Sequence, residues 1–197
     1  MNGTQEAPTR SLGKPSRRQF LGWSAAGVAL AGAAGAGMVP RFAIPAHAAG
    51  DVDLVQFAIS LELAAINAYT AGIPKLSSAT AAVATKIQSQ HKDHAAALGK
   101  AASGLGATPT TTPFALPAPP PLNTETDVLT YALGLENAAA ATYLDAIGRL
   151  QARDLQISLL TIMGDESEHA SVLASALKMD PVPDAFLSTS KSVAPKA

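Results

Sequence analysis

Hydrophobic residues recur at steps of three and four along four stretches of the chain, which is the spacing of one face of an α-helix. The stretches cover about Asp51–Gly72, Ser77–Ser103, Thr124–Leu150 and Asp154–Met179. Gly and Pro residues, which interrupt helices, separate them. The pattern therefore predicts four helices and no sheet.

The same spacing selects the residues that should face inward. In the first three helices they are Leu54, Phe57, Ala58, Leu61, Ala65 and Tyr69, then Val83, Ile87, His94 and Leu98, then Leu129, Leu133, Ala140 and Tyr143. The helix starts carry their own signals. Thr124 and Asp127 have the spacing of a capping box, and Ser77 and Ser78 are expected to cap the second helix. Asp51 and Asp53 are expected near the N-terminus of the first helix, where the helix dipole favours negative charge.

A proline-rich segment, residues 104–123, separates the second and third helices and holds six of the 14 prolines. It is too long for a tight turn between antiparallel helices, and its composition suits a semi-extended crossover. Residues 49–179 are therefore predicted to form one bundle of two antiparallel helical hairpins joined by this crossover. Residues 180–197 are expected to be a flexible C-terminal tail.

The N-terminus has the features of a signal for export. Residues 16–21 (SRRQFL) form a twin-arginine pattern, an apolar run follows over about Trp23–Met38, and residues 46–48 (AHA) resemble a cleavage site. We therefore expect residues 1–48 to be a twin-arginine signal peptide and the mature protein to be periplasmic or otherwise exported. A transmembrane anchor is the alternative, but the run is shorter than the ~20 apolar residues of a typical span.

Composition narrows the function classes. The chain has no Cys, which excludes disulfides, thiolate metal sites and thiol nucleophiles. Without residues 1–48, 14 of the 15 acidic and 9 of the 14 basic residues remain, so the mature chain is near −5. No basic patch survives to favour nucleic acid, and nothing else suggests stable membrane insertion.

The two halves of the predicted bundle repeat each other. Residues 57–62 (FAISLE) resemble residues 131–136 (YALGLE) at an offset of 74, and His94 corresponds to His169 at an offset of 75. Each half is thus a helix with an internal Glu followed by a helix with an inward His. An approximate two-fold axis could relate the hairpins and bring these polar residues together.

Glu166 and His169 lie three residues apart, on one face of an apolar helix. An ionised Glu in such a stripe is costly unless its charge is compensated. A carboxylate and an imidazole on one face can bind a divalent metal ion. The candidate ligands of the whole chain are three Glu and three His, all predicted to face inward: Glu62, His91, His94, Glu136, Glu166 and His169. The alternative is a polar core network of His–Glu pairs without metal.

These residues resemble the ferritin-like di-metal carboxylate superfamily, in which two helices each supply a Glu and the other two each supply Glu-x-x-His. More narrowly, the chain is similar to exported bacterial ferritin-like proteins, whose relatives include rubrerythrins and desiccation-related proteins. The resemblance covers about Asp51–Met179. It implies an all-α, ferritin-like four-helix bundle with one or two divalent ions, Fe or Mn in the first place and Zn or Cu otherwise.

By position, the resemblance implies that Glu62 and Glu136 are terminal carboxylates. His94 and His169 would be the imidazole ligands, and Glu166 would bridge two ions. The metal ion itself and the twin-arginine export machinery are the expected partners, and a homodimer is left open.

The family pattern places a second bridging Glu where this chain has His91. Three carboxylates leave about one positive charge of two divalent ions uncompensated. A single ion, an asymmetric pair, or a nitrogen-richer site for Zn, Cu or Mn therefore stay open. Asp165 could orient the free nitrogen of His169 but is expected to be solvated, and Asp93 and Glu168 lie off the inner face.

The resemblance implies a metal-dependent oxidoreductase or an oxidative-stress protein. The rival interpretation is a helical bundle without metal or catalysis, with a structural, stress-protection or interaction role. Tyr69 and Tyr143, at matching positions of the repeat, are expected to be core packing residues rather than redox groups.

Overall fold

The computed structural model describes residues 46–195, so the twin-arginine pattern and the apolar run after it lie outside the described residues. Within this range the chain forms helices and no strand, which confirms the all-α prediction. The long helices are α2 (Ala46–Gly72), α3 (Ser78–Gly104), α4 (Glu125–Ile147) and α5 (Arg153–Ala176). Two short 3-10 helices are η2 (Ile73–Lys75) and η3 (Thr189–Lys191).

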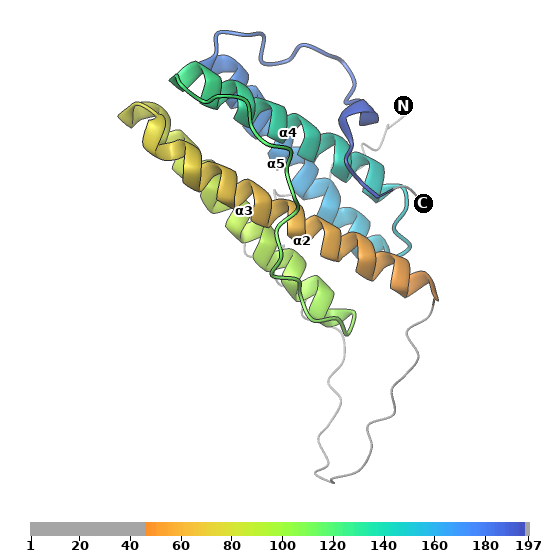
Figure 1. Cartoon of the computed structure of the whole chain (residues 1–197). Helices are drawn as coiled ribbons and strands as arrows, with labels where there is room; N and C mark the ends of the chain where they lie inside the picture. Colours follow the sequence, from red (N-terminus) through yellow and green to blue (C-terminus); the bar gives the residue numbers. More distant parts are fainter. Residues whose placement is uncertain (1–45, 196–197) are drawn as a thin grey trace, which may run out of the picture. The chain divides into compact units, whose positions relative to one another are not determined.

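The long helices form a four-helix bundle made of two antiparallel hairpins (Figure 1). Helix α2 packs most extensively against α3, and α4 packs most extensively against α5. The proline-rich crossover runs beside α2 from the end of α3 to the start of α4. The predicted architecture is therefore confirmed.

Specific contacts attach the crossover to α2. The amide nitrogen of Gln56 donates to the carbonyl of Thr108 at 2.6 Å, and its amide oxygen accepts from the N–H of Thr110 at 2.7 Å. Further along, the rings of Phe114 and Phe57 pack edge to face, with centroids 5.6 Å apart. A segment without regular structure thereby satisfies part of its backbone against a helix.

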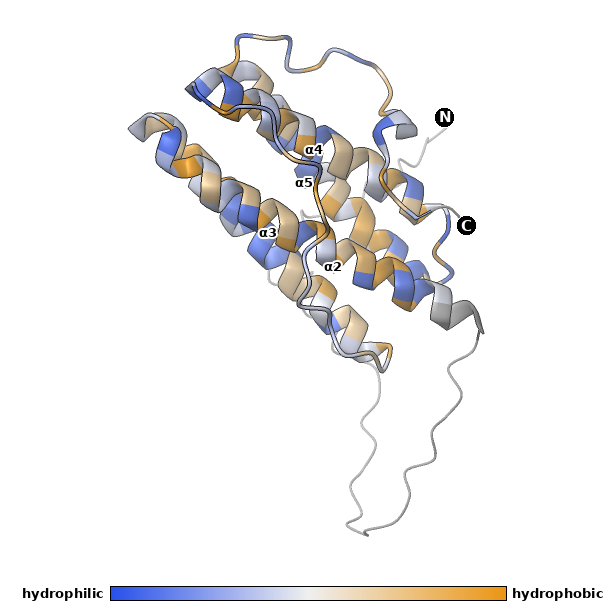
Figure 2. Ribbon diagram, in the orientation of Figure 1, coloured by the Kyte–Doolittle hydropathy of each residue, from blue (hydrophilic) through white to orange (hydrophobic). Residues whose placement is uncertain are grey.

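The apolar core is divided into two clusters. The larger one lies toward the start of α2 and consists of Leu54, Val55, Ala58, Ile59, Leu98, Ala102, Tyr143, Ala146, Leu150, Leu155, Leu159 and Ile162. The smaller one lies toward the end of α2 and consists of Tyr69, Ala84, Ile87, Leu129 and Leu173. Hydrophobic residues recur along all four long helices (Figure 2), and a layer of buried polar side chains lies between the two clusters. The buried polar side chains described below occupy this layer.

Most helix ends follow the predicted signals. Thr124 and Asp127 form the capping box, since the Thr124 hydroxyl accepts from the N–H of Asp127 at 3.1 Å and Asp127 accepts from the N–H of Thr124 at 2.9 Å. Ser77 is the N-cap residue of α3, but its hydroxyl donates to Glu125 at 2.9 Å and does not cap α3. Gly106, with φ of 81°, follows the end of α3 in the left-handed conformation.

The inner face predicted for α3 was wrong at Val83. Its side chain is 43% exposed, whereas Ala84 is 2% exposed and packs in the core. Ile87 and Leu98 of the same predicted face are buried. An Ala-rich helix gives little contrast between its faces, so the pattern selected Val83 although its neighbour Ala84 faces the core.

The role predicted for Asp51 was also wrong. Helix α2 begins at Ala46, so Asp51 lies inside the helix and not at its first turn. Its side chain is buried, and its two oxygens accept from the N–H groups of Gln151 and Ala152 at 2.8 and 2.9 Å. Asp51 therefore ties the start of the first hairpin to the link between α4 and α5.

The C-terminal segment lies against α4 in its last described residues. Val193 donates its N–H to the hydroxyl of Thr142 at 3.0 Å, and Ser192 donates to Asp145 at 2.9 Å. Arg149 also donates to the carbonyl of Pro195. The expected flexible tail is thus attached to the bundle here, because polar side chains of α4 reach it.

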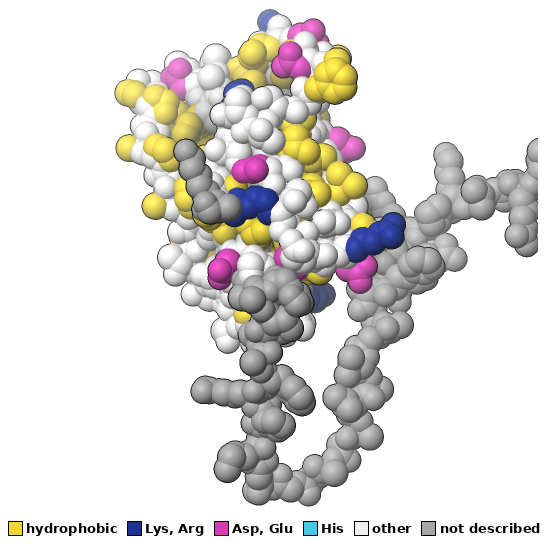
Figure 3. Space-filling model, turned by 90° about the vertical axis from the view of Figure 1, so that its right-hand side faces the viewer, with side chains coloured by type: hydrophobic (Ala, Val, Ile, Leu, Met, Phe, Trp, Pro, Cys, Tyr) yellow, Lys and Arg dark blue, Asp and Glu magenta, His cyan; other side chains and the backbone are white. Residues whose placement is uncertain are grey.

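On the face drawn in Figure 3, acidic and basic side chains are scattered among hydrophobic patches and form no stripe of one sign. One described segment, Gly50–Lys75, is long and apolar enough to cross a membrane by length and composition alone. Core helices of soluble bundles share that property. In this structure the segment carries the buried Glu62 and packs within the bundle.

Candidate metal centre

The six candidate ligands come together in the polar layer between the two apolar clusters. They are Glu62 on α2, His91 and His94 on α3, Glu136 on α4, and Glu166 and His169 on α5. All are buried except His94, whose side chain is 12% exposed. Asp93 and Glu168 face solvent, as expected. The helical spacing and the repeat therefore selected side chains that the fold does bring together.

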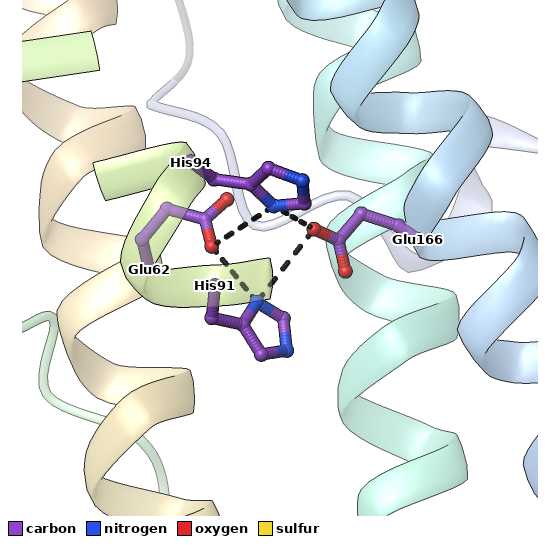
Figure 4. A group of neighbouring side chains, drawn as sticks. All are labelled: Glu62, His91, His94 and Glu166. Carbon is purple, nitrogen blue, oxygen red and sulfur yellow. Dashed lines mark hydrogen bonds and ion pairs between the residues drawn. The ribbon is translucent and has the colours of Figure 1, made fainter. Parts of the chain in front are cut away.

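The six residues form two overlapping groups, each with four possible ligand atoms within 4.8 Å of one another. The first group is Glu62, His91, His94 and Glu166 (Figure 4). The second group is His91, Glu136, Glu166 and His169. His91 and Glu166 belong to both. The two groups follow the two halves of the repeat, so the approximate two-fold relation extends to the centre.

His91 lies between the two terminal glutamates. Its Nδ1 is 2.8 Å from Glu62 Oε2, and its Nε2 is 3.3 Å from Glu136 Oε1. Burial by itself would lower the pKa of His91, but hydrogen bonds to Glu136 and Glu62 outweigh it and raise the pKa to about 11. In the metal-free protein the ring is therefore an imidazolium that pairs with both carboxylates.

Two tyrosines donate to Oε1 of the same glutamates. Tyr69 donates to Glu136 Oε1 at 2.5 Å, and Tyr143 donates to Glu62 Oε1. Burial, reinforced by the neighbouring carboxylates, raises the pKa of both phenols well above the ordinary range. Both are therefore neutral hydrogen-bond donors. Their rings pack in the core as expected, but the sequence analysis did not assign their hydroxyls to the site.

The three glutamates differ in charge state. Burial would raise the pKa of Glu62 and Glu136, but hydrogen bonds to histidines, chiefly His91 for Glu62 and His169 for Glu136, lower both. Burial raises the pKa of Glu166 to about 7, because its histidine neighbours compensate only in part. Glu166 is thus the carboxylate with the least compensation in the metal-free protein.

Asp165 was expected to be solvated, but it contacts both remaining imidazoles. Its Oδ2 is 3.1 Å from His94 Nε2 and 3.6 Å from His169 Nε2. Gln90 donates to both Asp165 oxygens at 3.2 Å. Gln90 occupies the repeat position of Asp165 at the offset of 75, and that correspondence is the signal that could have identified the pair.

Burial would lower the pKa of His94 and His169, but their carboxylate partners outweigh it. Contacts with Glu166 and Glu62 raise the pKa of His94 to about 10. Contacts with Glu136 and Glu166 raise the pKa of His169 to about 9. In the metal-free protein, protons on these two rings offset the negative charge of the buried glutamates.

Several buried polar atoms of the layer have no hydrogen-bond partner among the described residues. They are His94 Nδ1, His169 Nε2 and both carboxylate oxygens of Glu166. His94 Nδ1 and Glu166 Oε1 lie only 3.1 Å apart without forming a hydrogen bond. An unpaired buried carboxylate is costly, and nitrogen and oxygen donors directed at one point suit a divalent cation. The residues therefore fit a bound metal ion.

Two solved structures have a similar fold, and one of them is described as a diiron-carboxylate protein. A ferritin-like, diiron-carboxylate protein from Bacillus anthracis matches with a TM-score of 0.60 and 21% identity, over 67% of this chain and 98% of that one. A hypothetical protein from Pyrococcus furiosus matches with a TM-score of 0.54 and 20% identity, over 64% and 87%. Similarity at these identities shows the fold.

A search of curated proteins found no match. The profile of the ferritin-like domain, in contrast, matches residues 50–179, which span all four long helices and the crossover. Together with the bundle and its central layer, this match shows that the chain belongs to the ferritin-like domain family.

Proposed function

We propose that the protein binds divalent metal ions in the polar layer between its hairpins and acts as an exported metal-dependent redox protein. The observation that carries the proposal is the set of buried nitrogen and oxygen atoms without hydrogen-bond partners, centred on Glu166 and His94. A cation at this point would compensate the uncompensated carboxylate. The diiron-carboxylate description of the Bacillus anthracis protein supports iron as the first candidate, with manganese next.

Iron or manganese bound here would supply electron transfer to a small oxidant such as dioxygen or peroxide. The side chains of the chain would do the rest. The tyrosine hydroxyls hold Oε1 of Glu62 and of Glu136, while Oε2 of each carboxylate contacts a histidine of the centre. The apolar clusters on both sides exclude water and strengthen every charge interaction within the layer.

Export is part of the proposal and is supported by the twin-arginine pattern at residues 16–21. Cleavage after Ala48 would remove the first three residues of α2, Ala46–Ala48, and leave the buried Asp51 in place. Changing Arg17 and Arg18 to Lys should keep the protein in the cytoplasm at full precursor length. Cell fractionation and N-terminal sequencing of the exported form test this expectation.

Elemental analysis of the protein purified from the periplasm tests metal binding. We expect iron or manganese in stoichiometric amount in the wild type, and its loss in Glu166→Gln, because Glu166 belongs to both groups. Glu168→Gln is the matched control, since Glu168 is two residues away and exposed. The proposal would be contradicted if the purified wild type contained no metal and its melting temperature did not change on addition of metal.

A second candidate function is a helical module without metal. The observation that favours it is the pairing of His91 with both Glu62 and Glu136, which lets the layer hold together without a cation. This candidate predicts that chelator and metal leave the melting temperature unchanged. It also predicts that Glu166→Gln stabilises the bundle by removing a poorly compensated charge.

A further inference from the structure

We propose that the two halves of the centre are unequal, and that the first group is a four-coordinate site of higher affinity with two nitrogen and two oxygen ligands. This inference rests on the proposed metal binding and goes beyond it. It replaces the symmetric carboxylate-bridged pair with one tightly bound ion, and zinc and cobalt(II) are suitable probes of such a four-coordinate site. The ligands are Glu62, His91, His94 and Glu166.

The four nitrogen–oxygen distances within the first group lie between 2.8 and 3.7 Å, near those of a tetrahedral zinc site. Glu62 Oε2 is 2.8 Å from His91 Nδ1 and 3.6 Å from His94 Nδ1. Glu166 Oε1 is 3.1 Å from His94 Nδ1 and 3.7 Å from His91 Nδ1. Zinc bonds of 2.0–2.2 Å at tetrahedral angles place ligand atoms about 3.4 Å apart. The four side chains point at one another from three helices (Figure 4), so an ion needs little rearrangement to bind.

His94 and His169 differ in which ring nitrogen is free to bind an ion. His94 has its Nε2 3.1 Å from Asp165, while its Nδ1 faces the ligand set without a hydrogen bond. A carboxylate on the far nitrogen fixes the tautomer and ring orientation of a metal-binding histidine. His169 has the opposite arrangement, because its Nδ1 is bonded to Glu136 at 3.2 Å and its Nε2 lacks a partner. An ion in the first group displaces one hydrogen bond between ligands, from His91 to Glu62, whereas the second group contains two, from His91 and from His169 to Glu136.

Charge compensation leads to the same order of binding. Glu62 and Glu166 neutralise one divalent ion in the first group. Only Glu136 then remains for a second ion, which would keep about one positive charge in a buried layer. The family pattern avoids this with a fourth carboxylate, and here His91 stands in its place.

The origin of the asymmetry is visible in the sequence repeat. At the offset of 75, Gln90 and His91 correspond to Asp165 and Glu166. The two halves of the centre therefore differ at two adjacent positions, one a ligand and one a partner of ligands. The single remaining aspartate lies nearer to His94 than to His169.

The repeat supplies matched variants for the test. Metal-free protein is titrated with Zn(II) and Co(II) at neutral pH, with calorimetry for affinity and the visible absorption of Co(II) for geometry. We expect one tight ion with the intense visible bands of four-coordinate cobalt, and a second ion at least ~10-fold weaker. His94→Gln should weaken the tight ion ~100-fold or more, while His169→Gln should change it less than ~10-fold.

A second pair of variants keeps the test independent of any one substitution. Asp165→Asn should weaken the tight ion about 10- to 100-fold, the usual effect of altering such a partner. Gln90→Ala should have a smaller effect, because the hydrogen bonds of Gln90 go to Asp165 and not to the ligands themselves. Circular dichroism and melting in chelator show whether each variant folds, and only folded variants are compared.

The possible results separate this inference from the proposed function. Equal losses in His94→Gln and His169→Gln, or two ions of equal affinity, would overturn the unequal halves and leave metal binding intact. The weak bands of six-coordinate cobalt would overturn the four-coordinate site in the same way. Failure of folded wild-type protein to bind Zn(II), Co(II), Fe(II) or Mn(II) would overturn both.

Discussion

At the residue scale, each terminal glutamate is held by a tyrosine from the other hairpin. Tyr69 on α2 donates to Glu136 on α4, and Tyr143 on α4 donates to Glu62 on α2. These crossed hydrogen bonds link the hairpins through the layer where the ligands lie. In each glutamate the other oxygen, Oε2, contacts a histidine of the centre and is the oxygen that a cation would take.

Replacing Tyr143 with Phe should lower the free energy of unfolding by about 1–2 kcal/mol, because a buried ionised Glu62 loses a donor. Urea denaturation in chelator measures this effect. Tyr131→Phe is the control, since the Tyr131 hydroxyl makes no hydrogen bond within residues 46–195 and should change stability by less than ~0.5 kcal/mol. Equal effects of the two substitutions would contradict the role given to Tyr143.

A second prediction at this scale concerns Lys178, just beyond α5. It has φ of 58°, the left-handed conformation that glycine adopts more readily, and the turn is closed by Met179 donating to Ala174 at 2.9 Å. Lys178→Gly should raise the free energy of unfolding by about 0.5–1 kcal/mol, since relief of this strain exceeds the entropy that glycine adds to the unfolded chain. Lys178→Ala keeps the strain and should show no gain in the same urea titration.

At the scale of secondary structure elements, the hairpins are joined by side chains that bond to backbone groups of other elements. The clearest case is Asp51, which accepts from two N–H groups in the link before α5. Gln56 holds the crossover by donating to the carbonyl of Thr108 and accepting from the N–H of Thr110. Neither contact follows from helix periodicity, because both depend on which loop passes the helix.

Asp51→Ala should lower the free energy of unfolding by about 1–3 kcal/mol, because it leaves the N–H groups of Gln151 and Ala152 without their partner. Hydrogen exchange at these two amides should become faster in the variant. Asp53→Ala is the control at an exposed position two residues away, with an expected change within ~0.5 kcal/mol. Unchanged exchange at both amides would show that Asp51 does not hold the link.

At the scale of the whole molecule, the polar layer makes stability depend on pH and metal together. The pKa values of His91, His94 and His169 are raised from 6.5 to about 11, 10 and 9. A raised histidine pKa stabilises the folded state fully below the unfolded value of 6.5, and this stability is lost as pH rises through the folded values. For Glu62 and Glu136, with lowered pKa, stability is instead lost as pH falls below about 4.5.

The metal-free protein should therefore melt at progressively lower temperature as pH rises from about 7 to 9. A bound ion replaces protons in the layer, so the melting temperature of the metal-loaded protein should fall less as pH rises. The difference in melting temperature between the two forms should therefore widen. Thermal melts in chelator and in Zn(II) across this range measure both. Replacing His91 with Gln should flatten the decline of the metal-free form, and parallel curves for all samples would contradict this coupling.

The sequence predicted the number of helices, their approximate bounds and the six side chains of the layer. Helical periodicity is a local property, and a buried Glu or His in an Ala-rich stripe stands out against it. The repeat added that Glu62 and Glu136, or His94 and His169, should occupy equivalent places. These inferences need only the spacing along each helix and the equivalence of the two halves.

The tertiary structure alone decided how the equivalent places differ. Whether Asp165 contacts His94 or His169, and which ring nitrogen stays free, depends on how far α3 and α5 are rotated and shifted against each other. A shift of about one ångström decides such hydrogen bonds, and the same rotation exposes Val83 and buries Ala84. The sequence thus determined which residues meet in the layer, and helix packing determined which atoms face a common point.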